Sequence, residues 1–452
     1  MSKILAIAAA FTLLAGLTAC GGSSSSSGDT NPGSDVVTTG DAQTNDGTEG
    51  GDTTQSADLD HDFAGLTPIQ SGLTRETAPQ VPPSDLETLA ADNNRFAWKL
   101  YQQLRTEDGN LFFSPYSMTL ALAMTYAGAK STTATEMETA LEFSLGQSKL
   151  HTTLNALDLE LAKRGVGAQG ADGGKFRLNI VNAIWGRTGY TFLDPFLDTL
   201  ALNYGAGLFS LDFVGDPDGS RLLINDWVAT KTEERIKDLL PGGSVTSDTV
   251  LVLTNAIYFN AAWYSPFDEK DTDSDGVFTL LDSTTVKAVM MKQIAELEYK
   301  AGDGYQVVQM PYSAGENKAP ELSMYLILPD SGTFASFEGG LDSEAIEGII
   351  GGLGTRQVTL TLPRFEFTAQ FEASLLLGAL GMPTAFTDLA DFSGMNGIGG
   401  LVISKVIHKA FVKVNEQGTE AAAATAVIIN DTSVPEPATI TLDRPFLFLI
   451  RD

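Results

Sequence analysis

The chain has 452 residues, a hydrophobic content of 43% and a formal net charge of −29 at pH 7. This hydrophobic content is ordinary for a globular protein, and the strong negative charge argues against a nucleic-acid partner, whose phosphates it would repel. One cysteine and three histidines exclude intrachain disulfides and a cysteine metal cluster, and they leave little for a zinc site or a histidine-dependent hydrolase. We therefore expect no cofactor, no metal and no catalytic residues of its own.

The first twenty residues have the pattern of an export signal. Lys3 precedes an apolar run, 4–17, which is too short for a comfortable transmembrane helix. The run ends in Leu17-Thr18-Ala19-Cys20, which resembles a bacterial lipobox, although an ordinary signal with an incidental cysteine is the alternative. Lipidation of Cys20 would anchor the exported protein to a membrane without spanning it. We expect a protein at the cell envelope (the outer membrane in a Gram-negative cell) or outside the cell.

A change of composition marks the start of the folded part. Residues 21–83 are rich in Gly, Ser, Thr and Asp, which predicts a disordered acidic linker. From Ser84 onward apolar residues recur at helical spacing as far as Leu104, which predicts a first helix and a single folded domain over 84–452.

The next elements alternate between helical and strand patterns. Ser114 can cap a helix that has Pro115 at its first position and Gly128 after its end. Strands are predicted by runs of Val, Ile, Leu and Tyr over 177–185, 249–259, 321–328 and 358–367. In the last run the apolar phase flips at Pro363, which suggests a bulge or bend. The mixture predicts an α+β fold.

A segment near the end has split propensities. Its first half, from Lys413 to Ala426, is rich in small residues, and its second half, up to Ser433, is β-branched. Pro435 and Pro437 then break either form. The simplest interpretation is a surface helix that runs into a loop, but such a segment could also adopt more than one conformation.

Six stretches between residues 94 and 450 form a recognisable set. They are Asn94-Arg95-Phe96, Asn110-Leu111-Phe112-Phe113-Ser114-Pro115-Tyr116-Ser117, Asn182-Ala183-Ile184-Trp185, Leu253-Thr254-Asn255-Ala256-Ile257-Tyr258-Phe259-Asn260, Glu416-Gln417-Gly418-Thr419-Glu420 and Arg444-Pro445-Phe446-Leu447-Phe448-Leu449-Ile450. Together they resemble the serpin family, over about 94–452. The resemblance implies a large mixed β-sheet with smaller sheets, about eight or nine helices and a mobile reactive-centre loop.

The resemblance also implies roles for particular residues. The "shutter" residues, where the main sheet must open, are Ser114, Ser117, Asn225 and His408, and Trp263 matches the tryptophan near the point where the loop enters the sheet. Arg364 is expected to pair with Glu416 of the hinge. The hinge residues implied are Glu416, Gly418, Thr419, Glu420, Ala421, Ala422, Ala423 and Ala424.

The hinge sequence permits the insertion that inhibitory serpins use. After cleavage the loop must enter the sheet as a strand, and large or charged side chains on its inward parity would clash or lie unpaired. Thr419, Ala421, Ala423 and Thr425 share one parity and are small, while Glu420 falls on the outward parity. The resemblance therefore implies a monomeric, irreversible suicide-substrate inhibitor of a serine protease, with a papain-like cysteine protease as a further target, and not an enzyme.

The family's spacing puts the cleaved bond between Thr432 and Ser433, within about two residues. Thr432 is small and uncharged, which favours an elastase-like or subtilisin-like protease over a trypsin-like one. Serpins usually continue past the Pro-Phe-Leu-Phe-Leu-Ile strand with one more strand, whereas this sequence stops at Asp452. Either the sequence is incomplete or a core strand is missing, and the inhibitory prediction is conditional on this, because a missing core strand would destabilise the fold.

Two other functions fit parts of the sequence. A non-inhibitory serpin that binds or carries a ligand would be cut as a plain substrate. Residues Asp271 to Asp282 also follow the spacing of a calcium-binding loop, Asp-x-Asp-x-Asp-Gly with a later acid. No helices are predicted on either side of that loop, so an acidic turn is the preferred interpretation.

Overall fold

Two large β-sheets and a set of helices make up the chain. The computed structural model describes residues 4–8, 66–315, 318–419 and 436–452. Within that part the α-helices are α1 (Pro83–Leu104), α2 (Pro115–Tyr126), α3 (Ser131–Ala140), α4 (Gly146–Ala162), α5 (Asp194–Tyr204), α6 (Pro217–Lys231), α7 (Phe334–Gly339), α8 (Ser343–Ile350), α9 (Ser374–Leu380) and α10 (Ser393–Asn396). Short 3-10 helices occur at η1 (Lys163–Gly165), η2 (Glu269–Asp271) and η3 (Pro383–Phe386).

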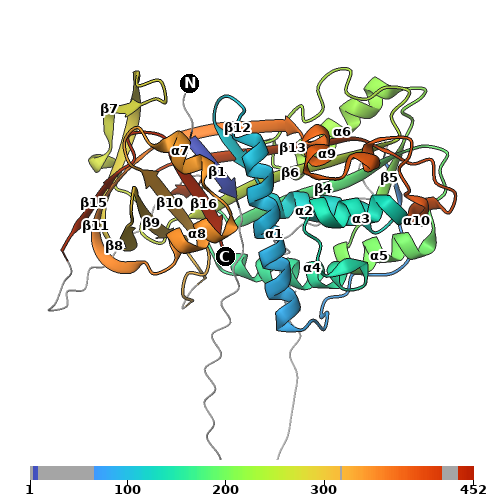
Figure 1. Cartoon of the computed structure of the whole chain (residues 1–452), viewed down its shortest axis with the longest axis horizontal. Helices are drawn as coiled ribbons and strands as arrows, with labels where there is room; N and C mark the ends of the chain where they lie inside the picture. The colour runs from blue at the N-terminus through green and yellow to red at the C-terminus, as the bar shows by residue number, and fades with distance from the viewer. Residues whose placement is uncertain (1–3, 9–65, 316–317, 420–435) are drawn as a thin grey trace, which may run out of the picture.

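A seven-stranded sheet runs along the long axis of the molecule (Figure 1). Its main path is β12-β13-β6-β4-β5-β2, with β14 paired to β6 at one end. Its strands are β2 (Thr67–Ile69), β4 (Arg177–Arg187), β5 (Leu208–Leu211), β6 (Leu251–Ala262), β12 (Phe365–Glu372), β13 (Ile403–Val414) and β14 (Gly418–Thr419).

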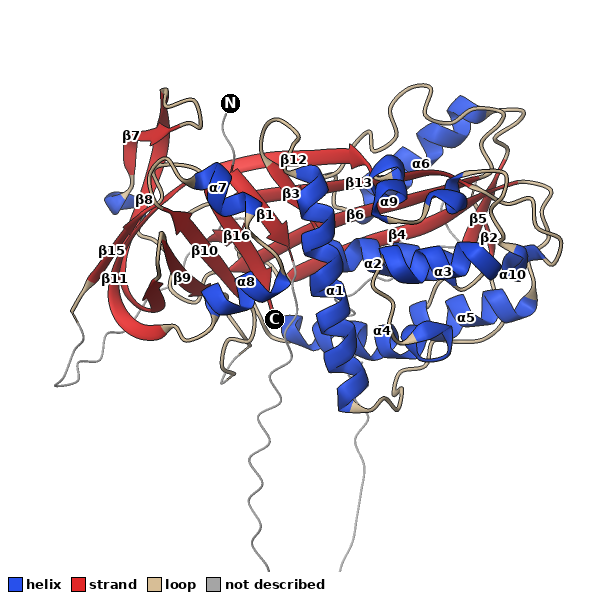
Figure 2. Ribbon diagram, in the orientation of Figure 1, coloured by secondary structure: helices blue, strands red, loops and turns tan. Residues whose placement is uncertain are grey.

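A nine-stranded sheet packs at one end of the molecule (Figure 2). Its path is β15-β11-β8-β9-β10-β16-β1-β3, with β7 paired to β8. Its strands are β1 (Ile4–Ala8), β3 (Leu111–Phe113), β7 (Asp273–Thr279), β8 (Thr285–Ala301), β9 (Tyr305–Pro311), β10 (Ser323–Pro329), β11 (Gly354–Pro363), β15 (Ala438–Thr441) and β16 (Phe446–Arg451).

The phase flip predicted at Pro363 is a change of sheet. β11 ends at Pro363 in the nine-stranded sheet, and β12 begins at Phe365 in the seven-stranded sheet, with Arg364 between them. At the position of the predicted bulge or bend, the structure has a break between two strands of different sheets. The flip arises because the two halves present their apolar residues to different sheets.

Helix α2 is the centre of the core. Ser114 caps it by accepting a hydrogen bond from the Ser117 backbone N–H, Pro115 occupies its first position, and all twelve of its residues are buried. A helix that is apolar all round is stable only when it is covered on every side. Here β4 and β6 lie on one side of α2, and α1 and α4 also pack against it.

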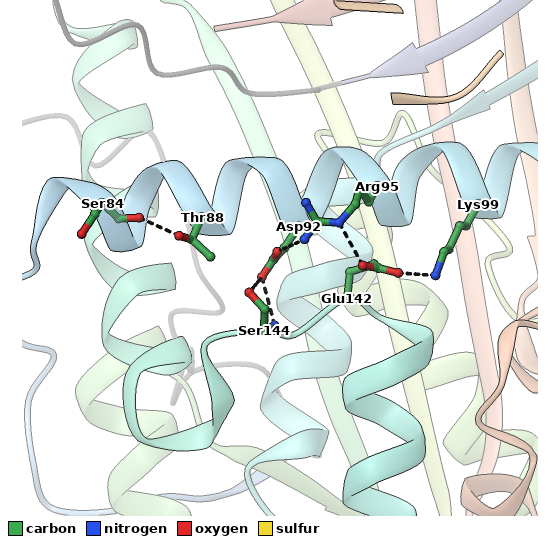
Figure 3. Close-up of polar contacts among 7 residues, drawn as sticks. All are labelled: Ser84, Thr88, Asp92, Arg95, Lys99, Glu142 and Ser144. Carbon is green, nitrogen blue, oxygen red and sulfur yellow. Dashed lines mark hydrogen bonds and ion pairs between the residues drawn. The ribbon is translucent and has the colours of Figure 1, made fainter. Parts of the chain in front are cut away.

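Polar contacts fasten α1 to the segment between α3 and α4 (Figure 3). Glu142 receives hydrogen bonds from Arg95, at 2.9 Å, and from Lys99, while Arg95 also pairs with Asp92. Asp92 accepts from both the backbone N–H and the hydroxyl of Ser144, at 3.0 and 2.7 Å. These contacts hold the long first helix across the face of the molecule.

The structure describes two stretches that precede the predicted start of the domain at Ser84. Residues 66–83, predicted as part of the disordered linker, are folded onto the domain, with β2 paired to β5. Ile4–Ala8, inside the predicted signal, forms β1 between β16 and β3. Among the helices that the structure describes, none combines the length and the apolarity needed to cross a membrane.

Candidate functional site

The hinge begins as a strand already seated at one end of the seven-stranded sheet. β13 runs parallel to β6 and pairs with it from Ile403 to Phe411. β13 ends at Val414 and the chain then turns back, so that Gly418 and Thr419 form β14, which pairs antiparallel with the last two residues of β6. Continued growth of β14 along β6 would place a new antiparallel strand between β6 and β13 and would break their pairing.

Close approach to β6 requires a glycine at the start of β14. A Cβ on Gly418 would lie 2.2 Å from the carbonyl oxygen of Ala261 and 2.8 Å from the Cβ of Ala171. Thr419 follows with only 1% of its surface exposed, and its hydroxyl lies 3.0 Å from the Tyr312 hydroxyl. A small side chain is therefore what this position can hold.

Trp263 fixes the turn that precedes β14. Its ring stacks on Tyr312 with centroids 4.7 Å apart, and its Nε1–H donates to the carbonyl of Asn415 at 3.0 Å. The Trp263 backbone N–H also donates to the carbonyl of Gln417, at 2.8 Å. Trp263 therefore lies beside β14, the last two residues of the hinge that the structure describes.

Glu416 is held by a charged and a neutral partner. Its side chain is 3% exposed and accepts hydrogen bonds from Arg364 and, at 2.9 Å, from the Thr272 hydroxyl. Burial raises the pKa of the carboxyl. The hydrogen bonds from Arg364, from the backbone and from Thr272, together with the charge of Arg364, outweigh this, so the pKa lies below its ordinary value. The side chain of Arg364 is 46% exposed, so solvent weakens its attraction to Glu416. We therefore expect the pair to position Glu416 and to contribute little to the free energy of folding.

A buried polar network spans three neighbouring strands of the seven-stranded sheet. Asn182 on β4, Asn255 on β6 and His408 on β13 are directly opposite one another in the sheet register. Asn255 donates to Asn182 and to the Ser117 hydroxyl, and its carbonyl oxygen contacts His408 Nδ1. His408 Nε2 accepts from the Ser114 backbone N–H at 3.3 Å. The His408–Asn255 contact crosses the β6–β13 boundary, so a new strand there must break it.

His408 is neutral in this network. It is fully buried, and burial lowers its pKa to about 3. Because Nε2 accepts a hydrogen bond, the remaining proton lies on Nδ1 and points to the carbonyl oxygen of Asn255. This geometry suits a structural hydrogen bond and offers no nucleophile to be activated.

Of the four predicted shutter residues, Ser114, Ser117 and His408 come together and Asn225 does not. Asn225 lies on α6, where its amide donates to the carbonyl of Leu240 and accepts from the same residue's N–H, at 2.9 and 2.7 Å. It fastens a loop to α6. The network's other members, Asn182 and Asn255, were not predicted as site residues, although an asparagine within each of two apolar strands was a visible signal.

The rest of the predicted hinge and the predicted cleavage site lie outside the described residues. This applies to Glu420, Ala421, Ala422, Ala423 and Ala424, to Thr432 and Ser433, and to Cys20.

The calcium-like spacing forms a hairpin. β7 pairs with β8, Asp275 forms an ion pair with Lys287, and Asp282 accepts two hydrogen bonds from Thr284. In the part of the chain that the structure describes, no three His, Cys, Asp or Glu side chains are grouped so as to hold a metal ion.

Comparison with known proteins agrees with this geometry. The family described as serpin (serine protease inhibitor) matches residues 91–452. The chain belongs to the serpin family. A serpin-like protein of Thermococcus kodakarensis is 37% identical over 362 residues, which are 79% of this chain and 81% of the relative. Leukocyte elastase inhibitor A of Rattus norvegicus is 36% identical over 384 residues, which are 81% of this chain and 96% of the relative.

Solved serpin structures share the fold. Human thyroxine-binding globulin superposes with a TM-score of 0.70 at 29% identity, covering 81% of this chain and 94% of the other. Tengpin, a thermophilic serpin in its native state, superposes with a TM-score of 0.71 at 27% identity, covering 85% and 95%. The α+β serpin fold predicted from the sequence is confirmed. Most members of the family inhibit proteases, and others are carriers.

Proposed function

We propose that this serpin is an irreversible suicide-substrate inhibitor of serine proteases, and that it is not itself an enzyme. The observation that carries the proposal is β14. Gly418 and Thr419 already form the first two residues of a strand that runs along β6, at the end of the sheet where β13 has left it. The small residues that follow in the sequence allow this strand to grow.

The covalent step uses the protease's own nucleophile. The protease serine Oγ forms an ester with the carbonyl carbon of Thr432, the Thr432–Ser433 amide bond breaks, and the Ser433 nitrogen leaves as an amine after taking a proton. The freed hinge then enters the sheet before water hydrolyses the ester. Fifteen strand residues span about 50 Å, which is enough to carry the bound protease across the molecule. A displacement of about 1 Å in the protease's active site then slows hydrolysis greatly.

An elastase-like or subtilisin-like target fits the small, uncharged Thr432 better than a trypsin-like one. Leukocyte elastase inhibitor A is among the relatives with more than a third of residues identical. A papain-like cysteine protease, which also forms an acyl-enzyme, is a further candidate.

The test incubates the protein with one protease of each class, elastase-like, subtilisin-like and trypsin-like. With the elastase-like or the subtilisin-like protease, we expect a covalent complex that survives boiling in detergent. We also expect a released C-terminal peptide that begins at Ser433. Clean cleavage by all three without a complex, together with no gain in thermal stability of the cleaved protein, would overturn the proposal.

The second candidate is a non-inhibitory carrier. It is favoured by the likeness to thyroxine-binding globulin in complex with thyroxine, which superposes with a TM-score of 0.68 at 29% identity. A carrier is cut as a plain substrate, so a substitution that blocks insertion changes nothing in its encounter with a protease.

We also propose that the protein is exported and lipid-anchored at Cys20. Removal of residues 1–19 would take β1 out of its place between β16 and β3. Expression in a bacterium with labelled fatty acid tests the anchor, with Cys20→Ala as the control. Label that is equal in both proteins, or absent from both, contradicts it.

A further inference from the structure

A folded segment precedes the part that the serpin family model matches. The match begins at residue 91, whereas the structure describes the chain from residue 66. Between 66 and 82 the chain first adds β2 to the edge of the seven-stranded sheet, antiparallel to β5, and then crosses α5 and α4 before it enters α1. We call residues 66–82 the strap.

Arg75 is the strap's main contact with the domain. Its Nη2 lies 2.6 Å from Asp158 Oδ2 and its Nε donates to Asn155 Oδ1 at 2.8 Å, both on α4. The side chains of Arg75 and Asp158 are only 16% and 5% exposed. Burying a carboxylate without a nearby cation costs free energy of folding. The cation that Arg75 supplies to Asp158 comes from outside the family-matched region.

Three further hydrogen bonds fasten the strap. The Ser71 hydroxyl donates to Asp198 on α5 at 2.5 Å, and the Glu76 backbone N–H donates to the carbonyl of Leu202 at 2.9 Å. Asn155 donates in turn to the carbonyl of Glu76, at 2.7 Å. The strap therefore ties together β5, α5 and α4.

The Arg75 contact lies next to the network beneath the sheet. The hydroxyl of Tyr116, the neighbour of network residue Ser117, donates to Asp158 at 3.4 Å. Arg75, Asp158 and the network residue Asn182 line the same small pocket. The contacts of the strap and the buried network that bridges β4, β6 and β13 therefore lie in the same region of the core.

We propose that the strap is a clamp that slows opening of the seven-stranded sheet, with Arg75 as its positioning residue. Growth of β14 requires the β6-β4-β5-β2 side of the sheet to move away from β13 and β12. The strap joins that moving side to α1, and α1 is held at its other end by hydrogen bonds from Gln102 to the carbonyls of Glu338 and Leu341. The clamp rests on the proposed loop-insertion function.

The experiment measures conversion of the uncut, full-length protein to a loop-inserted form. The protein is held at a temperature below its melting point, and samples are assayed for protease cleavage within 420–435 and for a second, higher melting transition. Both readouts work without any inhibited protease. If no protease is trapped but conversion occurs, the inhibitory proposal fails while the clamp is still tested.

Arg75→Ala should convert at least about tenfold faster than the unmodified protein, because loss of a buried ion pair destabilises the closed state. Asp158→Asn should have a similar effect, and the double variant should convert no faster than either single one, since both remove the same contact. Arg75→Lys keeps the positive charge but cannot contact both Asp158 and Asn155 as the guanidinium does. We therefore expect a conversion rate between those of the unmodified protein and Arg75→Ala.

Arg164→Ala is the matched control. Arg164 is also ion-paired and equally buried, at 15% exposure, with Asp452 as its 5% exposed partner, but it does not contact the strap. It should lower the melting temperature without faster conversion. Equal conversion rates for Arg75→Ala and Arg164→Ala, or additive effects of Arg75→Ala and Asp158→Asn, would overturn the clamp.

Discussion

Two histidines illustrate what burial does to single residues in this fold. His408 lies on β13 in the buried network, and His151 lies on α4 with its Nδ1 2.6 Å from the hydroxyl of Tyr204 on α5. Both side chains are buried, although His151 lies in a helix. Burial lowers the pKa of His151 to about 4 and that of His408 to about 3.

These shifts predict the pH dependence of stability. Both pKa values lie below the ordinary 6.5, so between about pH 3 and 6.5 the unfolded chain binds protons that the folded chain does not. The stability from these histidines is complete above pH 6.5 and declines as the pH falls, by up to about 1.4 kcal/mol per pH unit for each. The lowered pKa of Glu416 acts in the same direction, since its contribution is lost as the pH falls below 4.5.

Melting temperatures measured from pH 8 to pH 4 check this prediction. We expect a plateau above about pH 6.5 and a steady fall below it. His151→Phe keeps an aromatic ring against Tyr126 and Tyr204 but cannot take up a proton, so its curve should fall less steeply. A variant curve parallel to that of the unmodified protein would contradict the role assigned to His151.

At the scale of elements, β14 is the strand from which any further strand along β6 would grow. It is only two residues long, yet it determines the direction and the place in which any further strand would grow. Its position depends on the glycine that permits close approach to Ala261, on the Trp263–Tyr312 stack and on the Arg364–Glu416 pair. These contacts come from four different regions of the chain.

Thr419→Arg tests whether β14 is the start of insertion. Thr419 is buried beside Tyr312, so an arginine must either bury its guanidinium or stay outside the sheet. We expect insertion to slow by roughly 100-fold or more, so that the protease hydrolyses the ester and the inhibitor becomes a substrate. The ratio of trapped complex to cleaved protein on a detergent gel measures this.

Glu420→Arg is the matched control for Thr419→Arg. It also places an arginine in the hinge, but on the outward parity, where a charged residue already stands. It should leave trapping intact. If both variants become substrates, parity does not govern the hinge. If neither does, the loop is not inserted by way of β14.

At the scale of the whole molecule, the seven-stranded sheet has a place for one more strand, between β6 and β13. β6 and β13 pair directly along most of their length, yet they run parallel and leave room for an antiparallel strand between them only at the β14 end. A full strand inserted there would bond to both neighbours at once. Under the proposed function, a kinetic barrier holds the uncut form in place, and we propose that the buried network and the strap contribute to it.

Melting of the uncut and the cleaved protein tests this description. A protease that cuts within 420–435 without being trapped provides the cleaved form. We expect its melting temperature to rise by more than about 10 °C, because insertion adds a strand that is bonded on two sides. The cleaved Thr419→Arg protein should show little rise. Equal melting temperatures for the cut and uncut unmodified protein would mean that the loop does not insert.

The sequence by itself determined the fold class, the first helix, the capped helix α2 and the small residues of the hinge. These follow from local patterns: the 3.6-residue apolar period, the Ser-Pro cap and the alternation of side chains along a strand. The resemblance to the family singled out Trp263, Arg364 and His408. The structure shows contacts of Trp263 with Asn415, of Arg364 with Glu416 and of His408 with Asn255.

Only the tertiary structure decided which distant side chains meet. Asn182, Asn255 and His408 lie on three strands far apart in sequence, and strand register alone brings them opposite one another. Asn225 was misplaced because a polar residue on a helix carries no signal for what faces it. The strap was missed because its composition is that of a linker, and its order comes from contacts such as Arg75–Asp158, which depend on the assembled domain.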